Sequence, residues 1–149
     1  MNDPAVGAID HVAIVVADAD AAAGKLVELL GYLLAGDEVV AAAGVRLVYL
    51  ADPGGGGGTQ LQLVQPVEDG PVARFLTERG EGLHHVCFRT NDVHQALRDA
   101  QHHERGVFTG GRGQPCAFLD TEPHGLRIEL TELGTAYQDA AQPHGRDKR

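Results

Sequence analysis

The two halves of this chain repeat one order of segments, and this repeat limits the folds that the chain can adopt. Segment 9–16 opens the first half with β-branched and apolar residues around His11, and segment 83–89 opens the second half with His85 in the equivalent place. An alanine-rich helical segment follows each of them, and a short alternating strand comes later. A chain of 149 residues is ordinarily one domain, so we expect both halves to share it.

Helix and strand signals divide the first half. Asp18 can cap a helix that runs to Gly31, a residue type common at helix C-termini. Strands are expected after this helix, first a weak one near 37–42 and then at 45–50 and 60–64.

The second half is predicted to follow the same order. Its first strand covers 83–89, and Asn91 is the expected cap of a helix that ends near His103. Strands are expected near 117–119 and at 126–130.

A short helix is predicted to bridge the halves, because Pro71 is favoured in a first helical turn and Gly80 ends the apolar spacing. The residues beyond Gly134 are polar and charged, and we expect them to be disordered. The predicted organisation is an N-terminal extension 1–8, a domain 9–133 made of module 9–66, bridge helix 69–80 and module 83–132, and a tail 134–149.

Strand alternation predicts which side chains share a face, because residues i and i+2 of a strand point the same way. In the last strand of each half the apolar residues can pack on the helices, which leaves Gln62 and Glu129 on the other face. The same alternation places His11 and His85 on that face and His84 on the opposite one, as a core-lining residue or a partner of His85. All four polar side chains are therefore expected on the helix-free, concave side.

These four side chains predict a metal site. Two imidazoles, a carboxylate and an amide oxygen suit a divalent cation such as Co²⁺, Mn²⁺, Ni²⁺ or Zn²⁺, with positions left open for substrate or water. An amide is a weak ligand, so Gln62 has the alternative of being an ordinary polar strand residue. The predicted ligands are His11, Gln62, His85 and Glu129.

The acidic composition excludes several partners. The chain has 12 Lys and Arg against 21 Asp and Glu, a net charge of −9, which argues against binding to nucleic acid or to anionic membranes. Any anionic substrate must then be met by local cations. No apolar run approaches the roughly 20 residues of a membrane span, and we expect a cytoplasmic protein. Cys87 and Cys116 lack a CxxC spacing and are interpreted as buried hydrophobic residues.

Three further segments resemble one known family. QLVQP at 62–66, PVARFL at 71–76 and GEGLHHVCF at 80–88 are similar to the methylmalonyl-CoA epimerase family of the vicinal oxygen chelate (glyoxalase/bleomycin-resistance) superfamily. The resemblance covers about residues 9–132. It implies an α+β fold in which two βαβββ-type modules pair in one domain and a curved mixed sheet encloses a metal cleft. It also implies a homodimer and an acyl-CoA or related dicarbonyl substrate. The family's metal ligands fall on His11, Gln62, His85 and Glu129.

The resemblance also implies a reaction. A metal that chelates a malonyl thioester stabilises the enolate left when the α-proton departs, and reprotonation on the other face inverts the centre. Some family members carry a Glu three residues after a glycine of the second strand, and counting from Gly44 this position holds Leu47. Glu129 is then the best candidate for one proton transfer. The family's His-Pro after Phe118-Leu119 is also absent, since 120–122 reads Asp-Thr-Glu.

Three classes of function remain open from the sequence. The first is a metal-dependent epimerase that acts on methylmalonyl-CoA or a related malonyl thioester. The second keeps the fold and the metal but catalyses a glyoxalase-type isomerisation or another reaction of a specialised pathway. The third is a small-molecule-binding resistance protein, for which four metal ligands have no use. The epimerase-like bridge region favours the first class.

Overall fold

Each half of the chain forms a module of one helix and four strands. The computed structural model describes residues 6–54 and 57–133. The elements of the first half are β1 (Ile9–Val15), α1 (Ala19–Leu30), β2 (Leu33–Val40), β3 (Val45–Ala51) and β4 (Gln60–Pro66). Helix α2 (Pro71–Arg79) forms the predicted bridge. The elements of the second half are β5 (Gly82–Arg89), α3 (Val93–Asp99), β6 (Phe108–Thr109), β7 (Pro115–Phe118) and β8 (Ile128–Thr131).

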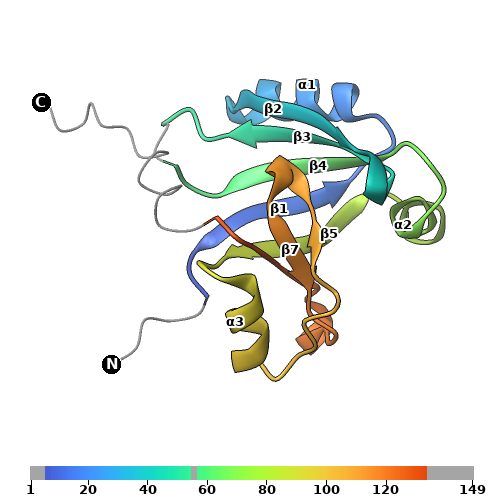
Figure 1. The fold of residues 1–149 in the computed structure, drawn as a ribbon. Coiled ribbons are helices and arrows are strands. Elements are labelled where there is room, and N and C mark those ends of the chain that lie inside the picture. The colour runs from blue at the N-terminus through green and yellow to red at the C-terminus, as the bar shows by residue number, and fades with distance from the viewer. Residues whose placement is uncertain (1–5, 55–56, 134–149) are drawn as a thin grey trace, which may run out of the picture.

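Within these residues the eight strands form one mixed sheet in the order β2-β3-β4-β1-β5-β8-β7-β6. Strands β1 and β5 are antiparallel at its centre, and each pairs in parallel with the last strand of its own half, β4 or β8. The sheet curls, so that β7 crosses the direction of β3 and β4 (Figure 1). The predicted α+β fold with a curved mixed sheet is confirmed.

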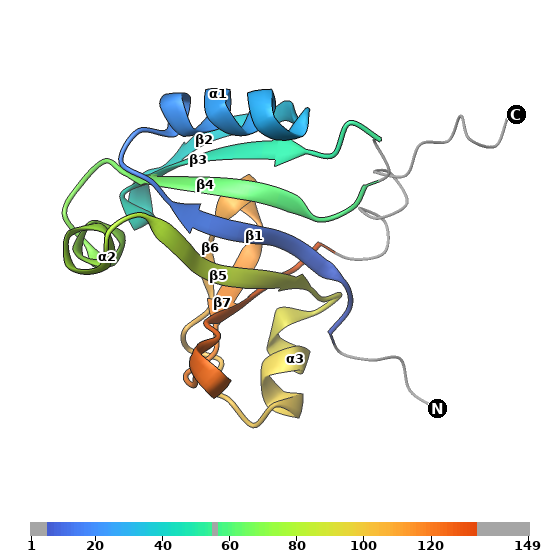
Figure 2. The same cartoon turned by 180° about the vertical axis from the view of Figure 1, so that it is seen from behind.

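Helices α1 and α3 cover the outer face of the sheet as the strand alternation predicts. Helix α1 lies along the first half and α3 beside the second (Figure 2). Leu61 and Leu63 pack in the cluster that contains α1 residues, and Ile128 and Leu130 pack with α3. The other face is not wholly free of helices, because α2 packs against it with Phe75 and its neighbours.

The helix of the second half differs from its prediction at both ends. Its N-cap is Asp92 rather than Asn91, because the Asp92 side chain accepts a hydrogen bond from the Gln95 backbone N–H at 3.0 Å. The helix ends at Asp99 instead of near His103. Gln101 takes a positive φ of 61°, which an α-helix does not accommodate.

Several strand boundaries were also predicted wrongly. Strand β2 begins at Leu33 rather than near residue 37, because it pairs with β3 from Leu33↔Ala51 onward. The predicted βαβββ module includes a strand at the place of β6 but gave no range for it, and β8 runs over Ile128–Thr131 instead of 126–130. These bounds depend on pairing with distant strands, which local sequence does not report.

No helix of the described residues is both long and apolar enough to cross a membrane. The predicted tail 134–149 and residues 1–5 of the predicted extension lie outside the described residues.

Candidate metal centre

A cavity of about 680 Å³ is lined by residues from both halves. All four predicted ligands line it, namely His11, Gln62, His85 and Glu129. Each is only 4–7 % exposed. Buried polar side chains need hydrogen-bond or metal partners, so the arrangement around each of them decides what the cavity can hold.

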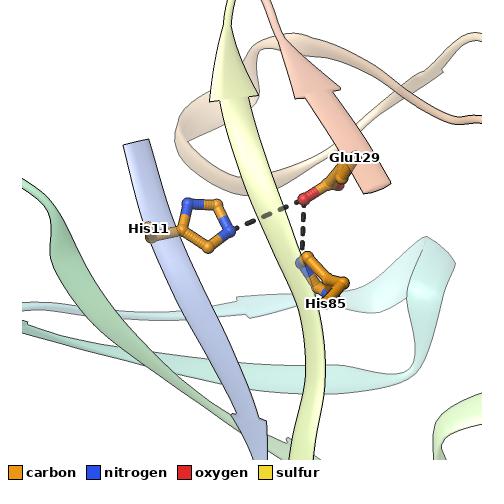
Figure 3. A group of neighbouring side chains, drawn as sticks. All are labelled: His11, His85 and Glu129. Carbon is orange, nitrogen blue, oxygen red and sulfur yellow. Dashed lines mark ion pairs between the residues drawn. The ribbon is translucent and has the colours of Figure 1, made fainter. Parts of the chain in front are cut away.

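Three of these side chains converge on one point. The ligand atoms of His11, His85 and Glu129 lie within 4.8 Å of one another. Glu129 Oε1 lies 3.0 Å from His85 Nε2 and 3.5 Å from His11 Nε2 (Figure 3). A divalent ion bound at about 2.1 Å to each atom needs ligand atoms roughly 3–4 Å apart. The observed separations fit such an ion.

The two imidazoles also leave their inner nitrogens unpaired. Nε2 of His11 and Nε2 of His85 are buried and make no hydrogen bond to the described residues. Glu129 is close to both, without the alignment that a hydrogen bond requires. A buried polar atom without a partner is destabilising, and a cation between these nitrogens and the carboxylate would satisfy all three groups. The residues present therefore fit a divalent metal ion.

Strand register gives Gln62 the position equivalent to that of Glu129. In the parallel pair β1–β4, Gln62 lies opposite Ala13, two residues after His11. In the parallel pair β5–β8, Glu129 lies opposite Cys87, two residues after His85. The two halves thus offer their His and their oxygen ligand in the same relation.

A β-bulge precedes the ligand of the first half. Ile9 pairs with Phe88 and His11 with Cys87, so Asp10 is the extra residue of β1. Its carboxylate is fully buried, and Asp10 Oδ2 lies 2.7 Å from His11 Nδ1. A carboxylate on the outer nitrogen of a histidine orients the ring and fixes its tautomer for metal binding.

A second bulge precedes His85, the predicted ligand of the other half, and corrects the prediction for His84. Ala13 pairs with His85 and Ile14 with Leu83, so His84 is the extra residue of β5. The bulge brings His84 into the same cavity instead of onto the opposite face. His84 Nδ1 lies 2.8 Å from His85 Nδ1, so it is a partner of the ligand, the second of the two roles expected for it.

The family of the chain follows from comparison with known proteins. Residues 10–118 match the profile of the Glyoxalase/Bleomycin resistance protein/Dioxygenase superfamily. The chain belongs to this superfamily. The resemblance found in the sequence is thereby confirmed.

Several relatives within the superfamily are epimerases. An ethylmalonyl-CoA/methylmalonyl-CoA epimerase from Cereibacter sphaeroides is 32 % identical over 86 % of this chain and 99 % of its own length. The crystal structure of methylmalonyl-CoA epimerase from Mycobacterium tuberculosis aligns with TM-score 0.76 and 29 % identity over 88 % of this chain and 91 % of that chain. A methylmalonyl-CoA epimerase in complex with methylmalonyl-CoA and NH4+ aligns with TM-score 0.72 and 32 % identity over 85 % and 94 %. The prediction of an enzyme related to these epimerases is confirmed.

Electrostatics of this superfamily member favour an ionised carboxylate at the centre. Burial raises the pKa of Glu129, but the neighbouring imidazoles of His11 and His85 outweigh it and lower the pKa to about 2. Burial lowers the pKa of His11, but Asp10 and Glu129 outweigh it and raise that pKa above its ordinary value. Without a metal the centre therefore attracts positive charge, which a divalent cation supplies.

The remaining cavity wall combines apolar and charged groups. Leu47 is buried and lines the cavity, so the position where some epimerases carry a Glu presents an aliphatic wall here. Charged side chains beyond the centre also line the cavity, namely Glu68, Asp69, Arg74, Glu78, Arg79, Arg112, Glu122 and Arg127. Glu129 is therefore one of several carboxylates along the wall.

Two residues that support His11 were assigned no role from the sequence, namely Asp10, which contacts it, and Arg112, which contacts Asp10. Asp10 directly precedes the predicted ligand His11 in the sequence, and this position could have indicated a role for it beside the metal site. Arg112 stands in the run Gly-Gly-Arg-Gly and binds Asp10 Oδ2 at 2.9 Å across 102 positions of sequence. No local pattern indicates such a contact.

Proposed function

We propose that this protein is a metal-dependent epimerase that inverts the α-carbon of methylmalonyl-CoA or a related malonyl thioester through an enolate. The observation that carries the proposal is the pair of unpaired, buried Nε2 atoms of His11 and His85 facing the Glu129 carboxylate. The epimerases among the relatives support the reaction and the substrate class.

In this proposal one divalent cation is held by His11, Gln62, His85 and Glu129. Co²⁺, Mn²⁺, Ni²⁺ and Zn²⁺ all suit two imidazoles with one carboxylate and one amide oxygen. When bound, the ion supplies a Lewis acid that stabilises negative charge on an enolate oxygen. Epimerisation removes one α-proton and returns another to the opposite face, so it requires no redox cofactor.

The apolar part of the wall keeps water away from the reacting carbon. Leu47, Val64 and Phe75 line the cavity together with the four polar side chains. Electrostatic interactions gain strength where water is excluded, so the wall makes each charged group of the centre more effective.

Cations along the wall can receive the anionic part of an acyl-CoA. Arg74, Arg79 and Arg127 line the cavity, and the guanidinium groups of Arg79 and Arg127 lie 5.4 Å and 5.6 Å from the ring centroid of Phe75. A chain of net charge −9 needs such local cations to bind an anionic substrate. We assign the acyl-CoA contacts to this group of arginines.

Glu129 is our candidate for one of the two proton transfers. Its carboxylate is ionised at neutral pH, as a base must be, because the pKa lies near 2. So low a pKa also makes a weak base. In this proposal Glu129 loosens from the centre before it accepts a proton.

The proposal is tested by proton NMR of methylmalonyl-CoA in deuterated water. Metal-loaded protein should exchange the α-proton for deuterium, and neither the chelated protein nor free metal should do so. The variant His85→Ala serves as a matched control that removes one ligand from the same cavity. Absence of exchange above the metal-only rate across several malonyl thioesters would favour the glyoxalase-type class. A homodimeric state and a cytoplasmic location stay predictions from the sequence.

A further inference from the structure

A loop of the second half reaches across the sheet and rests on the first half. This loop, residues 110–113 with a single 3-10 turn at Gly111–Gly113, connects β6 and β7. The backbone N–H of Arg112 donates to Glu38 Oε2 at 2.8 Å, and the hydroxyl of Tyr49 donates to the same oxygen at 2.8 Å. The loop at one edge of the sheet thus contacts β2 and β3 at the other edge.

The close approach depends on glycine. A Cβ atom at Gly111 would collide with the Tyr49 hydroxyl, so a larger residue would force the loop away. Arg112 itself has φ 59° and ψ 18°, a left-handed conformation that is unfavourable for a residue with a side chain. Such a conformation persists only where the surrounding contacts hold it.

The contacts of the Arg112 side chain stabilise this left-handed conformation. Its Nη1 donates to Asp10 Oδ2 at 2.9 Å and its Nη2 donates to Gln60 Oε1 at 2.8 Å. The guanidinium carbon lies 4.6 Å from the centroid of the Tyr49 ring. Arg112 therefore joins the loop to β1, β3 and β4 of the first half.

Asp10 transmits this contact to the metal ligand. Its Oδ2 also faces His11 Nδ1 at 2.7 Å, and its Oδ1 accepts from Arg89 Nε at 2.9 Å. Between two guanidinium groups the carboxylate is an acceptor only, so His11 Nδ1 must carry the proton. The lone pair of the neutral His11 ring is then on Nε2, the atom that faces Glu129.

We propose that Arg112 is a positioning residue which, through Asp10, holds His11 in the orientation and tautomer that a metal ion needs. The inference rests on the metal site of the proposed function. A series of contacts from Arg112 through Asp10 to His11 then connects the docked 110–113 loop with the metal site. By linkage, an ion bound at His11 stabilises the docked loop to the extent that the loop strengthens metal binding.

The test measures Co²⁺ binding to Arg112→Gln by titration, followed through the visible absorption of the ion. We expect a loss of affinity of about 10- to 100-fold, as is typical when a partner of a metal-binding histidine is removed, together with a changed absorption spectrum. Arg112→Lys should restore part of the affinity, because its ammonium can still contact Asp10 but cannot bridge to Gln60.

Arg46→Gln is the matched control. Arg46 is bound by two carboxylates, Asp20 and Asp37, and its side chain is 22 % exposed against 21 % for Arg112. Its loss should leave Co²⁺ affinity and spectrum unchanged. Parental Co²⁺ binding by Arg112→Gln would overturn the inference.

A second measurement needs no variant and covers a failure of Arg112→Gln to fold. Co²⁺ should slow hydrogen exchange of the Arg112 backbone amide in the parent protein, and an unchanged exchange rate would overturn the inference. The outcomes also separate the two proposals. A parent that binds Co²⁺ but exchanges no α-proton contradicts only the epimerase activity, whereas a parent that binds no Co²⁺ contradicts the metal site and this inference together.

Discussion

The two halves of the centre present their predicted ligands in the same way but support them differently. In each half a bulge residue directly precedes the ligand histidine, Asp10 before His11 and His84 before His85. Asp10 is a carboxylate between two arginines, whereas His84 is an imidazole that accepts from Arg127 Nη1 at 2.6 Å. The two halves thus share the backbone bulge before the histidine, but the side chain that contacts the histidine is a carboxylate in one half and an imidazole in the other.

The difference decides which half is ready for a metal ion. A guanidinium is always a donor, so His84 Nε2 accepts and His84 Nδ1 carries the proton. His84 Nδ1 then donates to His85 Nδ1, so a neutral His85 ring carries its single N–H proton on Nε2. Burial and the neighbouring His85 and Arg127 lower the pKa of His84 to about 3, which agrees with a neutral ring. When both rings are neutral, His11 is therefore in the tautomer that a metal ion needs, and His85 has to rearrange.

Glu129→Gln makes the oxygen ligands of the two halves alike and should have the largest effect. It keeps the shape and an oxygen ligand but removes the carboxylate. If Glu129 transfers a proton, the variant should retain metal and lose turnover by roughly 10²–10⁴-fold. Metal content by elemental analysis and α-proton exchange by NMR measure the two properties separately. Exchange at the parent rate would make Glu129 a ligand only.

Asp10→Asn and His84→Gln compare the two supports directly. Asp10→Asn leaves Arg89 and Arg112 without their shared buried carboxylate, and we expect a loss of about 3–5 kcal/mol in the free energy of unfolding. His84→Gln removes a neutral side chain that accepts one charge-assisted hydrogen bond from Arg127, and it should cost about 1.5–3 kcal/mol. Urea unfolding of both metal-free variants at pH 7.5 measures the difference. Equal losses would contradict the distinction between a charged and a neutral support.

Arg127→Gln and Arg112→Gln should change metal affinity in opposite directions. Loss of Arg127 frees His84 Nε2 from its donor, so His85 can place its proton on Nδ1 and offer Nε2 to the ion. We expect Co²⁺ affinity to rise by up to about tenfold, the equivalent of one hydrogen bond. A titration in which Arg127→Gln binds Co²⁺ more weakly than the parent would show that the second half needs no rearrangement.

Acid stability gives the smallest effect and tests the charge on Asp10. Hydrogen bonding and charge from His11, Arg112 and Arg89 outweigh burial and hold the pKa of Asp10 well below its ordinary value. A lowered pKa stabilises the folded state above the unfolded pKa, near 4, and this stabilisation is lost as the pH falls below it. Unfolding stability of the parent should therefore decline more steeply from pH 4 downward than that of Asp10→Asn. Parallel declines would place the stabilising charge elsewhere.

Much of the centre could be predicted because strand alternation is a local property. The face shared by His11, Gln62 and Glu129 followed from period two in strands whose apolar residues pack on helices. His84 broke this rule, because a bulge shifts the alternation by one residue and leaves no mark in the pattern of polar and apolar residues.

The support of the centre could not be predicted for a different reason. Arg112 reaches Asp10 across 102 positions, and only the curl of the sheet brings the 110–113 loop at its edge onto the central strand β1. The same limit applies to the start of β2, which is set by pairing with β3. Contacts of this kind depend on the whole fold.

Crystals of Co²⁺-loaded protein, with the ion located by anomalous scattering, test the central claim most directly. The claim is that two equivalent but differently supported halves bind one ion. We predict a single ion at about 2.0–2.2 Å from its four ligand atoms. These ligand atoms are Nε2 of His11, Nε2 of His85, a carboxylate oxygen of Glu129 and the amide oxygen of Gln62. An ion bound away from these side chains, or held by the histidine of only one half, would contradict the account.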